Sequence, residues 1–143
     1  MDLNRMRRAA QAGFTLLELL VVIVIIGLLA AYVGPKYFAK LAQSKSTIAK
    51  QQIEAFGKSL DTYRLDVGRY PSTEEGLAAL LAAPAANAAK WHGPYLSKAV
   101  PVDPWDHAYV YRAPGSKGDY DLISYGLDGQ PGGTAEDADI SNN

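Results

Sequence analysis

An unbroken apolar stretch near the start of the chain constrains the fold more than any other feature of the sequence. It runs from Phe14 to Val33, and Glu18 is its only charged residue. At about 1.5 Å of rise per residue, a helix of this length spans roughly 30 Å, which is the thickness of a bilayer hydrocarbon core. We therefore expect residues 14–34 to form a transmembrane helix.

The segment that precedes this stretch is positively charged. Arg5, Arg7 and Arg8 stand there against a single acid, Asp2. The positive-inside rule predicts that this leader, residues 1–13, stays in the cytoplasm while the rest of the chain crosses the membrane. A cleaved secretory signal fits poorly, because the apolar core is too long and lacks a good small-residue cleavage site. An ordinary signal anchor explains the length and the charge but leaves Glu18 unexplained.

Glu18 requires a partner if it lies in a membrane. A carboxylate in a transmembrane segment costs about 2.5–3.5 kcal/mol on insertion scales. Cleavage between Gly13 and Phe14 would create a positively charged α-amino group. This amine is poorly placed to pair with Glu18 of its own helix, but it meets the Glu18 of a neighbouring helix staggered by about one turn. Such a pair would neutralise both charges and set the stagger between subunits.

The segment AGFTLLE, residues 12–18, resembles the processing motif of type IV prepilins and pseudopilins. In that family a prepilin peptidase cuts after the glycine and methylates the new N-terminal phenylalanine, and the glutamate is needed for assembly. The resemblance implies cleavage after Gly13, N-methylation of Phe14, and assembly through Phe14 and Glu18.

Gly34 and Pro35 follow the apolar stretch directly. Proline inside a helix removes a backbone hydrogen bond, so we expect a kink or local melting here, with a plain helix end as the alternative. We favour an interrupted helix because apolar residues recur beyond it along one helical stripe. The stripe consists of Ala49, Ile53, Phe56, Leu60 and Tyr63. Residues 35–143 are thus expected to form an amphipathic helix and a globular head.

The head is expected to belong to the α+β class. Ser72 and Glu75 have the spacing of a capping box and predict a short helix through about Ala82. Two strand-like runs, 107–112 and 119–124, flank a turn and predict an antiparallel hairpin with Tyr109 and Tyr111 on one face. The expected fold is a pilin-like lollipop: a long N-terminal helix, transmembrane in its first half, and a small head with a short helix and a short antiparallel sheet.

The order of motifs in the head resembles the G-type major pseudopilins of type II secretion. The motifs are Gly68-x-Tyr70-Pro71-Ser72, Gly76-Leu77, Gly93-Pro94-Tyr95-Leu96, Asp103-Pro104-Trp105 and SYGLDG at 124–129. The resemblance implies a homopolymeric filament in the periplasm that helps drive folded exoproteins through the outer membrane. The implied partners are minor pseudopilins, the prepilin peptidase, an inner-membrane assembly platform and the membrane itself.

Two other functions compete with this one. The first is the major subunit of a type IV pilus, used for adhesion, motility or DNA uptake. Type IVa pilins usually close a C-terminal loop with a disulfide, which this chain cannot do because it has no cysteine. The second is a membrane-anchored periplasmic binding module that never polymerises.

The C-terminal loop, residues 125–141, contains four acids, and no basic residue follows Lys117. Crowded carboxylates repel one another, and calcium suits an irregular set of oxygen ligands, although the spacing of an EF-hand is missing. Composition alone favours a solvated acidic tail. The resemblance reverses this preference, since G-type pseudopilins bind calcium at this place. It implies side-chain ligands from Asp128, Asp137 and Asp139 and carbonyl ligands from Tyr125 and Gln130. Ser141 is a further ligand that it implies.

Composition and motifs argue against other classes of function. Charged residues make up 20% of the chain and the net charge is −1, so we expect no binding to nucleic acid. His92 and His107 stand outside any nucleophile or zinc motif and are expected to be surface or packing residues. We therefore expect no enzymatic activity.

Overall fold

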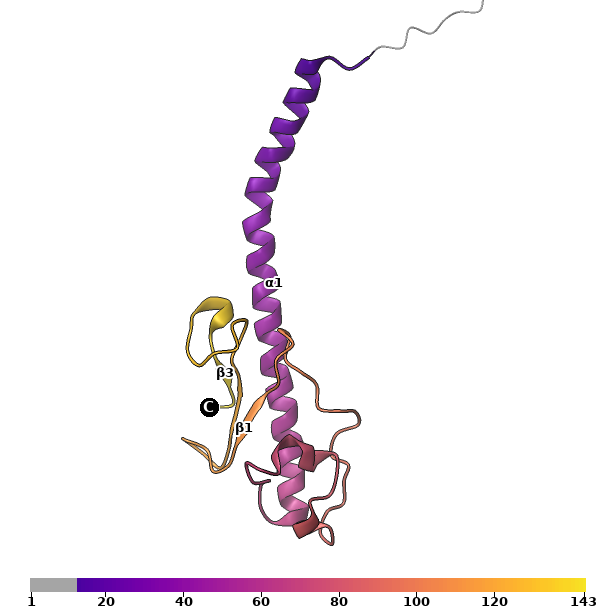
Figure 1. Ribbon diagram of the computed structural model, residues 1–143, viewed down its shortest axis with the longest axis vertical. Helices are drawn as coiled ribbons and strands as arrows, with labels where there is room; N and C mark the ends of the chain where they lie inside the picture. Colours follow the sequence, from indigo (N-terminus) through magenta and orange to yellow (C-terminus); the bar gives the residue numbers. More distant parts are fainter. Residues whose placement is uncertain (1–12) are drawn as a thin grey trace, which may run out of the picture. The chain divides into compact units, whose positions relative to one another are not determined.

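The computed structural model describes residues 13–143; the predicted basic leader therefore lies outside the described residues, apart from Gly13. The chain divides into two compact units, Met1–Phe38 and Ala39–Asn143. The described residues, 13–143, form one α-helix, three short 3₁₀ helices and three strands (Figure 1). In chain order they are α1 (Leu16–Val67), η1 (Gly76–Leu80), η2 (Ala85–Asn87), β1 (Val110–Arg112), β2 (Asp121–Ser124), η3 (Ala135–Asp137) and β3 (Ile140–Ser141).

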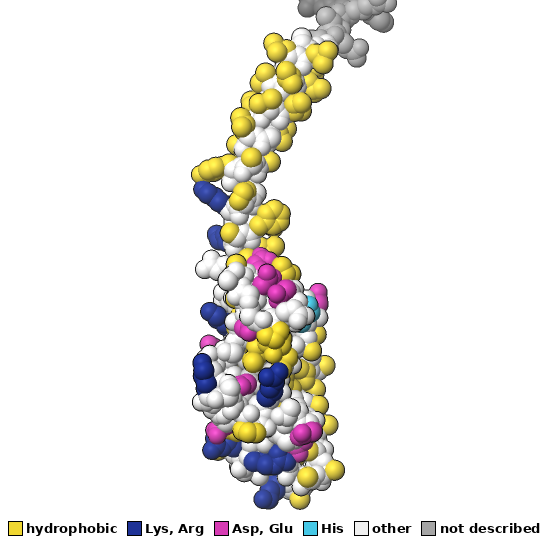
Figure 2. Space-filling view, turned by 60° about the vertical axis from the view of Figure 1, so that its left-hand side comes forward, with side chains coloured by type: hydrophobic (Ala, Val, Ile, Leu, Met, Phe, Trp, Pro, Cys, Tyr) yellow, Lys and Arg dark blue, Asp and Glu magenta, His cyan; other side chains and the backbone are white. Residues whose placement is uncertain are grey.

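The described part of the first unit is dominated by the apolar half of α1. Each residue from 14 to 33 is exposed, and Figure 2 shows hydrophobic side chains along this part of the helix. Within residues 13–143, α1 is the one helix long and apolar enough to cross a membrane. The structure thus agrees with the predicted transmembrane helix.

The predicted melting at Gly34 and Pro35 is wrong, because α1 is helical through both residues. Pro35 has no N–H to donate to the carbonyl of Ala31, and its ring crowds that carbonyl, at a cost of about 3 kcal/mol. This cost is local. The helix continues for several turns on both sides of Pro35, with leucine and alanine before it and alanine, leucine and lysine after it, and these turns keep the proline inside a single helix.

In the second unit, the C-terminal part of α1 carries the hydrophobic core. The predicted stripe is confirmed, since all five of its residues are buried. Leu80, Trp105 and Leu122 from the rest of the head belong to the same buried cluster. The helix ends before Gly68, which adopts a φ of +87° that favours glycine. The Gly68 N–H donates to the carbonyl of Arg64 over 2.8 Å.

The capping box at Ser72 and Glu75 is confirmed by its two reciprocal hydrogen bonds. The Ser72 N–H donates to Glu75 Oε2 over 2.8 Å, and the Glu75 N–H donates to Ser72 Oγ over 3.2 Å. The helix that follows is η1, which is a 3₁₀ helix and ends at Leu80, two residues before the predicted end. Leu77 and Leu80 of η1 are buried against the core.

The three strands form one antiparallel sheet in the order β1-β2-β3. The predicted hairpin is confirmed with shorter strands, and Tyr109 and Tyr111 are both buried, as the alternation predicts. Strand β3 was not predicted, because two residues are too few to show a period of two. Asn142 continues the pairing beyond β3: its N–H donates to the Leu122 carbonyl over 3.2 Å, and its side-chain oxygen accepts from the Leu122 N–H over 2.7 Å.

Candidate functional site

The predicted processing site lies just before the first turn of α1. Gly13 and Phe14 precede the helix, which begins at Leu16, and the side chain of Phe14 is 85% exposed. A peptide bond outside regular structure can adopt the extended form that peptidases bind. The geometry around the Gly13–Phe14 bond is therefore compatible with cleavage there.

Glu18 is held by a capping box that the sequence reasoning missed. The Glu18 N–H donates to Thr15 Oγ1 over 3.1 Å, and Glu18 Oε2 accepts from the Thr15 N–H over 2.8 Å and from its hydroxyl over 3.0 Å. The signal was present as Thr-x-x-Glu at the start of an apolar run. The capping box places the carboxylate at the positive end of the helix dipole. Both bonds use Oε2, so Oε1 has no hydrogen bond within residues 13–143.

The six predicted calcium ligands all lie in or beside one C-terminal loop. Tyr125 and Asp137 are half-buried, whereas Asp128, Gln130, Asp139 and Ser141 are exposed, with Ser141 in β3. The carboxylate of Asp128 accepts the N–H of Gln130, and that of Asp139 accepts the N–H of Gly132, each over 3.0 Å. Within residues 13–143, no three acidic, histidine or cysteine side chains form a group that could hold a metal.

The two ends of this loop are nevertheless brought together by backbone contacts. The N–H of Leu127 donates to the carbonyl of Glu136 over 2.9 Å. Gly126 has a φ of +67°, and a Cβ there would lie 2.5 Å from the same carbonyl oxygen. At Gly133, φ is +85°, and a Cβ would clash with the carbonyl of Asp137. Only glycine fits these positions, so these two glycines allow the two ends of the loop to approach each other closely.

A buried carboxylate anchors the start of the loop. Asp103 is 2% exposed; its Oδ1 accepts the N–H groups of Trp105 and His107 over 3.0 and 2.9 Å, and its Oδ2 accepts the hydroxyl of Ser124. The Ser124 Oγ in turn accepts the N–H of Gly126 over 3.3 Å. A chain of hydrogen bonds thus runs from the head interior to the first residues of the loop. The sequence showed Asp103 only as part of a family-like motif and indicated no such role.

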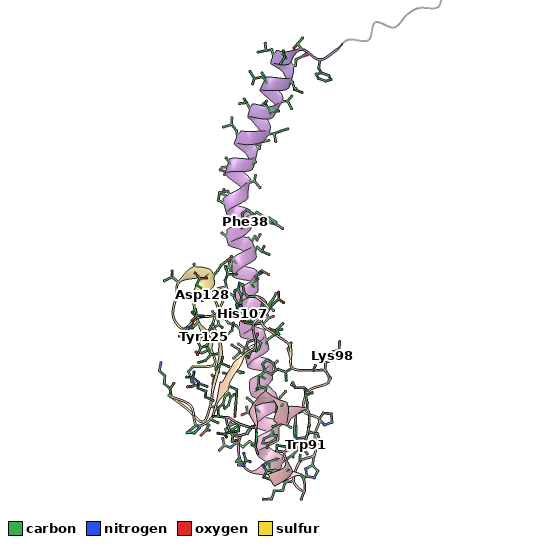
Figure 3. All side chains as sticks on the ribbon, viewed as in Figure 1. Phe38, Trp91, Lys98, His107, Tyr125 and Asp128 are labelled. Atoms are coloured by element: carbon green, nitrogen blue, oxygen red, sulfur yellow. The ribbon has the colours of Figure 1, made fainter. Side chains whose placement is uncertain are left out.

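His107 packs against the same loop. Figure 3 shows it beside Tyr125 and Asp128, which are also labelled there. Its Nδ1 lies 3.0 Å from the carbonyl of Gly126, and because a carbonyl only accepts, Nδ1 carries the hydrogen. A Cβ on Gly129 would lie 3.2 Å from the ring. His107 is therefore a packing residue, and His92 is exposed, as predicted for the two histidines.

The buried tyrosines of the head serve the fold. Burial raises the pKa of Tyr109 and of Tyr111, so both hydroxyls stay protonated across the physiological range. Tyr109 donates to Gln52 Oε1, and Tyr111 donates to the carbonyl of Pro71 over 2.9 Å. Each hydroxyl joins two segments that are far apart in the sequence.

Comparisons with known proteins fit both halves of the chain. Residues 8–34 match the prokaryotic N-terminal methylation motif, and residues 36–143 match the family described as type II secretion system (T2SS), protein G. A type II secretion system core protein G from Pseudomonas aeruginosa is 48% identical over 139 residues, covering 96% of this chain and 98% of the relative. The corresponding protein from Vibrio cholerae is 41% identical over 142 residues, covering 98% and 95%.

A solved structure matches as well. The crystal structure of the major pseudopilin from the type 2 secretion system of enterohaemorrhagic Escherichia coli has a TM-score of 0.62 and 31% identity. The match covers 73% of this chain and 91% of that chain.

These findings define the chain first as a pilin-like subunit, with an N-methylation motif, an apolar membrane-anchoring helix and a small α+β head. Within that class, the chain belongs to the family of type II secretion system protein G. It is a structural pseudopilin, a subunit of the type II secretion pseudopilus, and the alternative of a type IV pilus subunit is not favoured.

Proposed function

We propose that the chain is cleaved after Gly13 by a prepilin peptidase, is methylated on Phe14, and polymerises with copies of itself. Before assembly it is held in the inner membrane by a single span, with its head in the periplasm. In the periplasmic filament it works with minor pseudopilins and an inner-membrane assembly platform, and it helps drive folded exoproteins through the outer membrane.

One observation carries this proposal: Glu18 stands at the start of an exposed apolar helix, and among residues 13–143 only one of its carboxylate oxygens, Oε2, accepts hydrogen bonds. Thr15 binds Oε2, so Oε1 remains available to a neighbour's amine on Phe14. Capping within a helix and pairing between helices are therefore compatible. In surroundings of low dielectric constant, an ion pair that is also hydrogen-bonded holds two helices at a fixed stagger.

Replacing Glu18 by leucine tests this proposal. We expect Glu18→Leu to insert stably in the membrane, because a desolvated charge is removed, and to form no filaments. Subunit level in membrane fractions and filament yield by electron microscopy are the two measurements. Glu54→Leu, an exposed acid of α1 in the second unit, is the matched control and should assemble. Normal filament yield from Glu18→Leu would refute the pairing.

Processing has its own test, which is intact-mass measurement of the chain from membranes that contain the peptidase. The expected mass corresponds to a chain that begins at Phe14 with one added methyl group. Gly13→Leu should keep the leader, because the glycine before the cut is part of the recognised motif. A chain that retains residues 1–13 beside an active peptidase would contradict cleavage.

We propose further that calcium binds to the C-terminal loop. Three carboxylates, from Asp128, Asp137 and Asp139, share a loop with the carbonyl groups of Tyr125 and Gln130 and with Ser141. This is a set of hard oxygen donors, which is the type that calcium prefers. Among residues 13–143, the carboxylates of Asp128 and Asp139 are hydrogen-bonded only to backbone N–H groups of their own loop, and these bonds can exchange for a cation. Calcium would supply positive charge and cross-links among these oxygens.

A further inference from the structure

The apolar part of α1 ends in a cluster of exposed aromatic and basic side chains. Tyr32, Tyr37 and Phe38 are each about two-thirds exposed, and Lys36 stands among them. We call these four residues the interfacial belt. All of them belong to the first unit of the chain, and Phe38 is labelled in Figure 3.

Tyr32 and Lys36 form one preorganised group on a single face of the helix. They are four residues apart, and the Lys36 Nζ donates to the Tyr32 hydroxyl over 2.7 Å. The ammonium group also lies 4.1 Å from the centroid of the tyrosine ring. The pair thus combines an apolar ring with a polar, positively charged end formed by the hydroxyl and the ammonium group.

The position of this group along the helix matches the far face of a bilayer. Tyr32 follows Phe14 by 18 residues and Lys36 follows it by 22. At about 1.5 Å per residue, these distances are roughly 27 and 33 Å, the span from one hydrocarbon boundary to the other. Tyrosine rings settle at this level, and lysine extends its charge from there into the headgroup layer.

We propose that the interfacial belt binds the phosphate groups of anionic phospholipids in the periplasmic leaflet and so sets the depth of the helix. Lys36 supplies the charge that complements a phosphate, and Tyr32 supplies a hydroxyl and the ring that orients the ammonium group. Fixing this end of the span also fixes the other, which keeps the Gly13–Phe14 bond at the opposite face. The inference rests on the membrane insertion in the proposed function, but it does not depend on polymerisation or calcium.

The absence of cysteine makes the depth of the helix directly measurable. Ala30→Cys in the full chain can carry a single fluorescent label, and vesicles of phosphatidylethanolamine and phosphatidylglycerol can carry quenchers at two known depths. We expect Lys36→Glu and Tyr32→Ala each to shift the label by about one helical turn, roughly 5 Å. Lys36→Gln, a milder change, should give a smaller shift in the same direction.

Two controls separate this effect from a general change of charge or of assembly. Lys58→Glu reverses a charge of α1 in the second unit and should leave the label where it is. Phosphatidylcholine vesicles, which lack anionic lipid, should shift the wild-type label as Lys36→Gln does. An unchanged depth in both belt variants would overturn the proposal. Unchanged depth together with lost filaments would assign the belt to a neighbouring subunit instead.

Discussion

The carboxylate of Asp103 links several segments of the head by hydrogen bonds. It is buried and satisfies two backbone N–H groups and a buried hydroxyl, each from a different position in the sequence. Removing the acceptor leaves those donors buried without partners, and each orphaned donor costs about 1–3 kcal/mol. A buried acid is tolerated here because three donors surround it.

We therefore expect Asp103→Ala to destabilise the head by about 3 kcal/mol or more. Tryptophan fluorescence, to which the buried Trp105 and the partly buried Trp91 both contribute, reports unfolding of the head in urea. Asp103→Asn should lose less stability, since the amide oxygen still accepts one or two of the bonds. Glu54→Ala, an exposed acid, is the control and should change little. Equal midpoints for Asp103→Ala and the wild type would show that the network contributes nothing.

Individual residues differ in how far the sequence reveals their roles. Glu18 was predicted because a charge inside an apolar run contradicts its surroundings, and that contradiction is visible without any structure. Asp103 was not, because its partners are backbone groups that a turn assembles around it, together with Ser124, which lies 21 residues away. Donors of this kind leave no pattern in a sequence.

At the scale of elements, the same capping pattern occurs at two helix starts. It was predicted at Ser72 and Glu75 but not at Thr15 and Glu18, although the same Ser/Thr-x-x-Glu spacing is present in the sequence at both places. At the second capping box, Arg69 binds both carboxylate oxygens of Glu75 over 2.7 Å. These hydrogen bonds lower the pKa of Glu75 below its ordinary value, and the Ser72 N–H adds to the effect.

A carboxyl group with a lowered pKa stabilises the folded head above the pKa of the unfolded chain and loses that contribution as the pH falls. For a glutamate, the loss begins near pH 4.3 and continues downward through the folded pKa. We expect the urea midpoint to fall over this window in the wild type. The fall should be shallower in Glu75→Gln, which keeps the capping geometry but cannot titrate. Glu54→Gln should follow the wild type, and equal slopes for all three proteins would contradict the argument.

Sequence patterns predicted some of the elements and missed others, and the physical reasons differ from element to element. The stripe on α1 and the alternation of Tyr109 and Tyr111 were confirmed, because each element has one face in the core and one outside. The break predicted at Pro35 was wrong, because the lost hydrogen bond and the crowding of one proline cost less than the helical turns on both sides contribute. Strand β3 has only two residues and owes its existence to β2, which is a tertiary partner.

At the scale of the whole molecule, the head must be stable without any disulfide, because the chain contains no cysteine. A cation that binds only the folded form raises stability by about 2.7 kcal/mol at a concentration one hundred times its dissociation constant. The C-terminal loop is the place where such a cation would act, since its backbone is closed and the carboxylates of Asp128 and Asp139 accept hydrogen bonds from N–H groups of the loop itself.

We expect chelation of calcium to lower the melting temperature of the full chain in detergent, followed by tryptophan fluorescence. Asp128→Ala and Asp139→Ala should lower it in calcium and abolish the response to chelator. Glu136→Gln, the fourth acid of the loop and not an assigned ligand, is the matched control and should keep the response. Superimposable melts with and without calcium would show that the loop holds no such site.

The exposed apolar half of α1 has an energetic consequence for any cycle of growth and disassembly. In a bilayer its side chains face hydrocarbon tails, and inside a bundle of such helices they would face one another, so the hydrophobic effect contributes little to the transfer between the two. The work of extracting a subunit would then lie mainly in moving the charges at Glu18 and Lys36 and in breaking head contacts. A subunit built in this way can leave its polymer and return to the lipid without ever meeting water along its span.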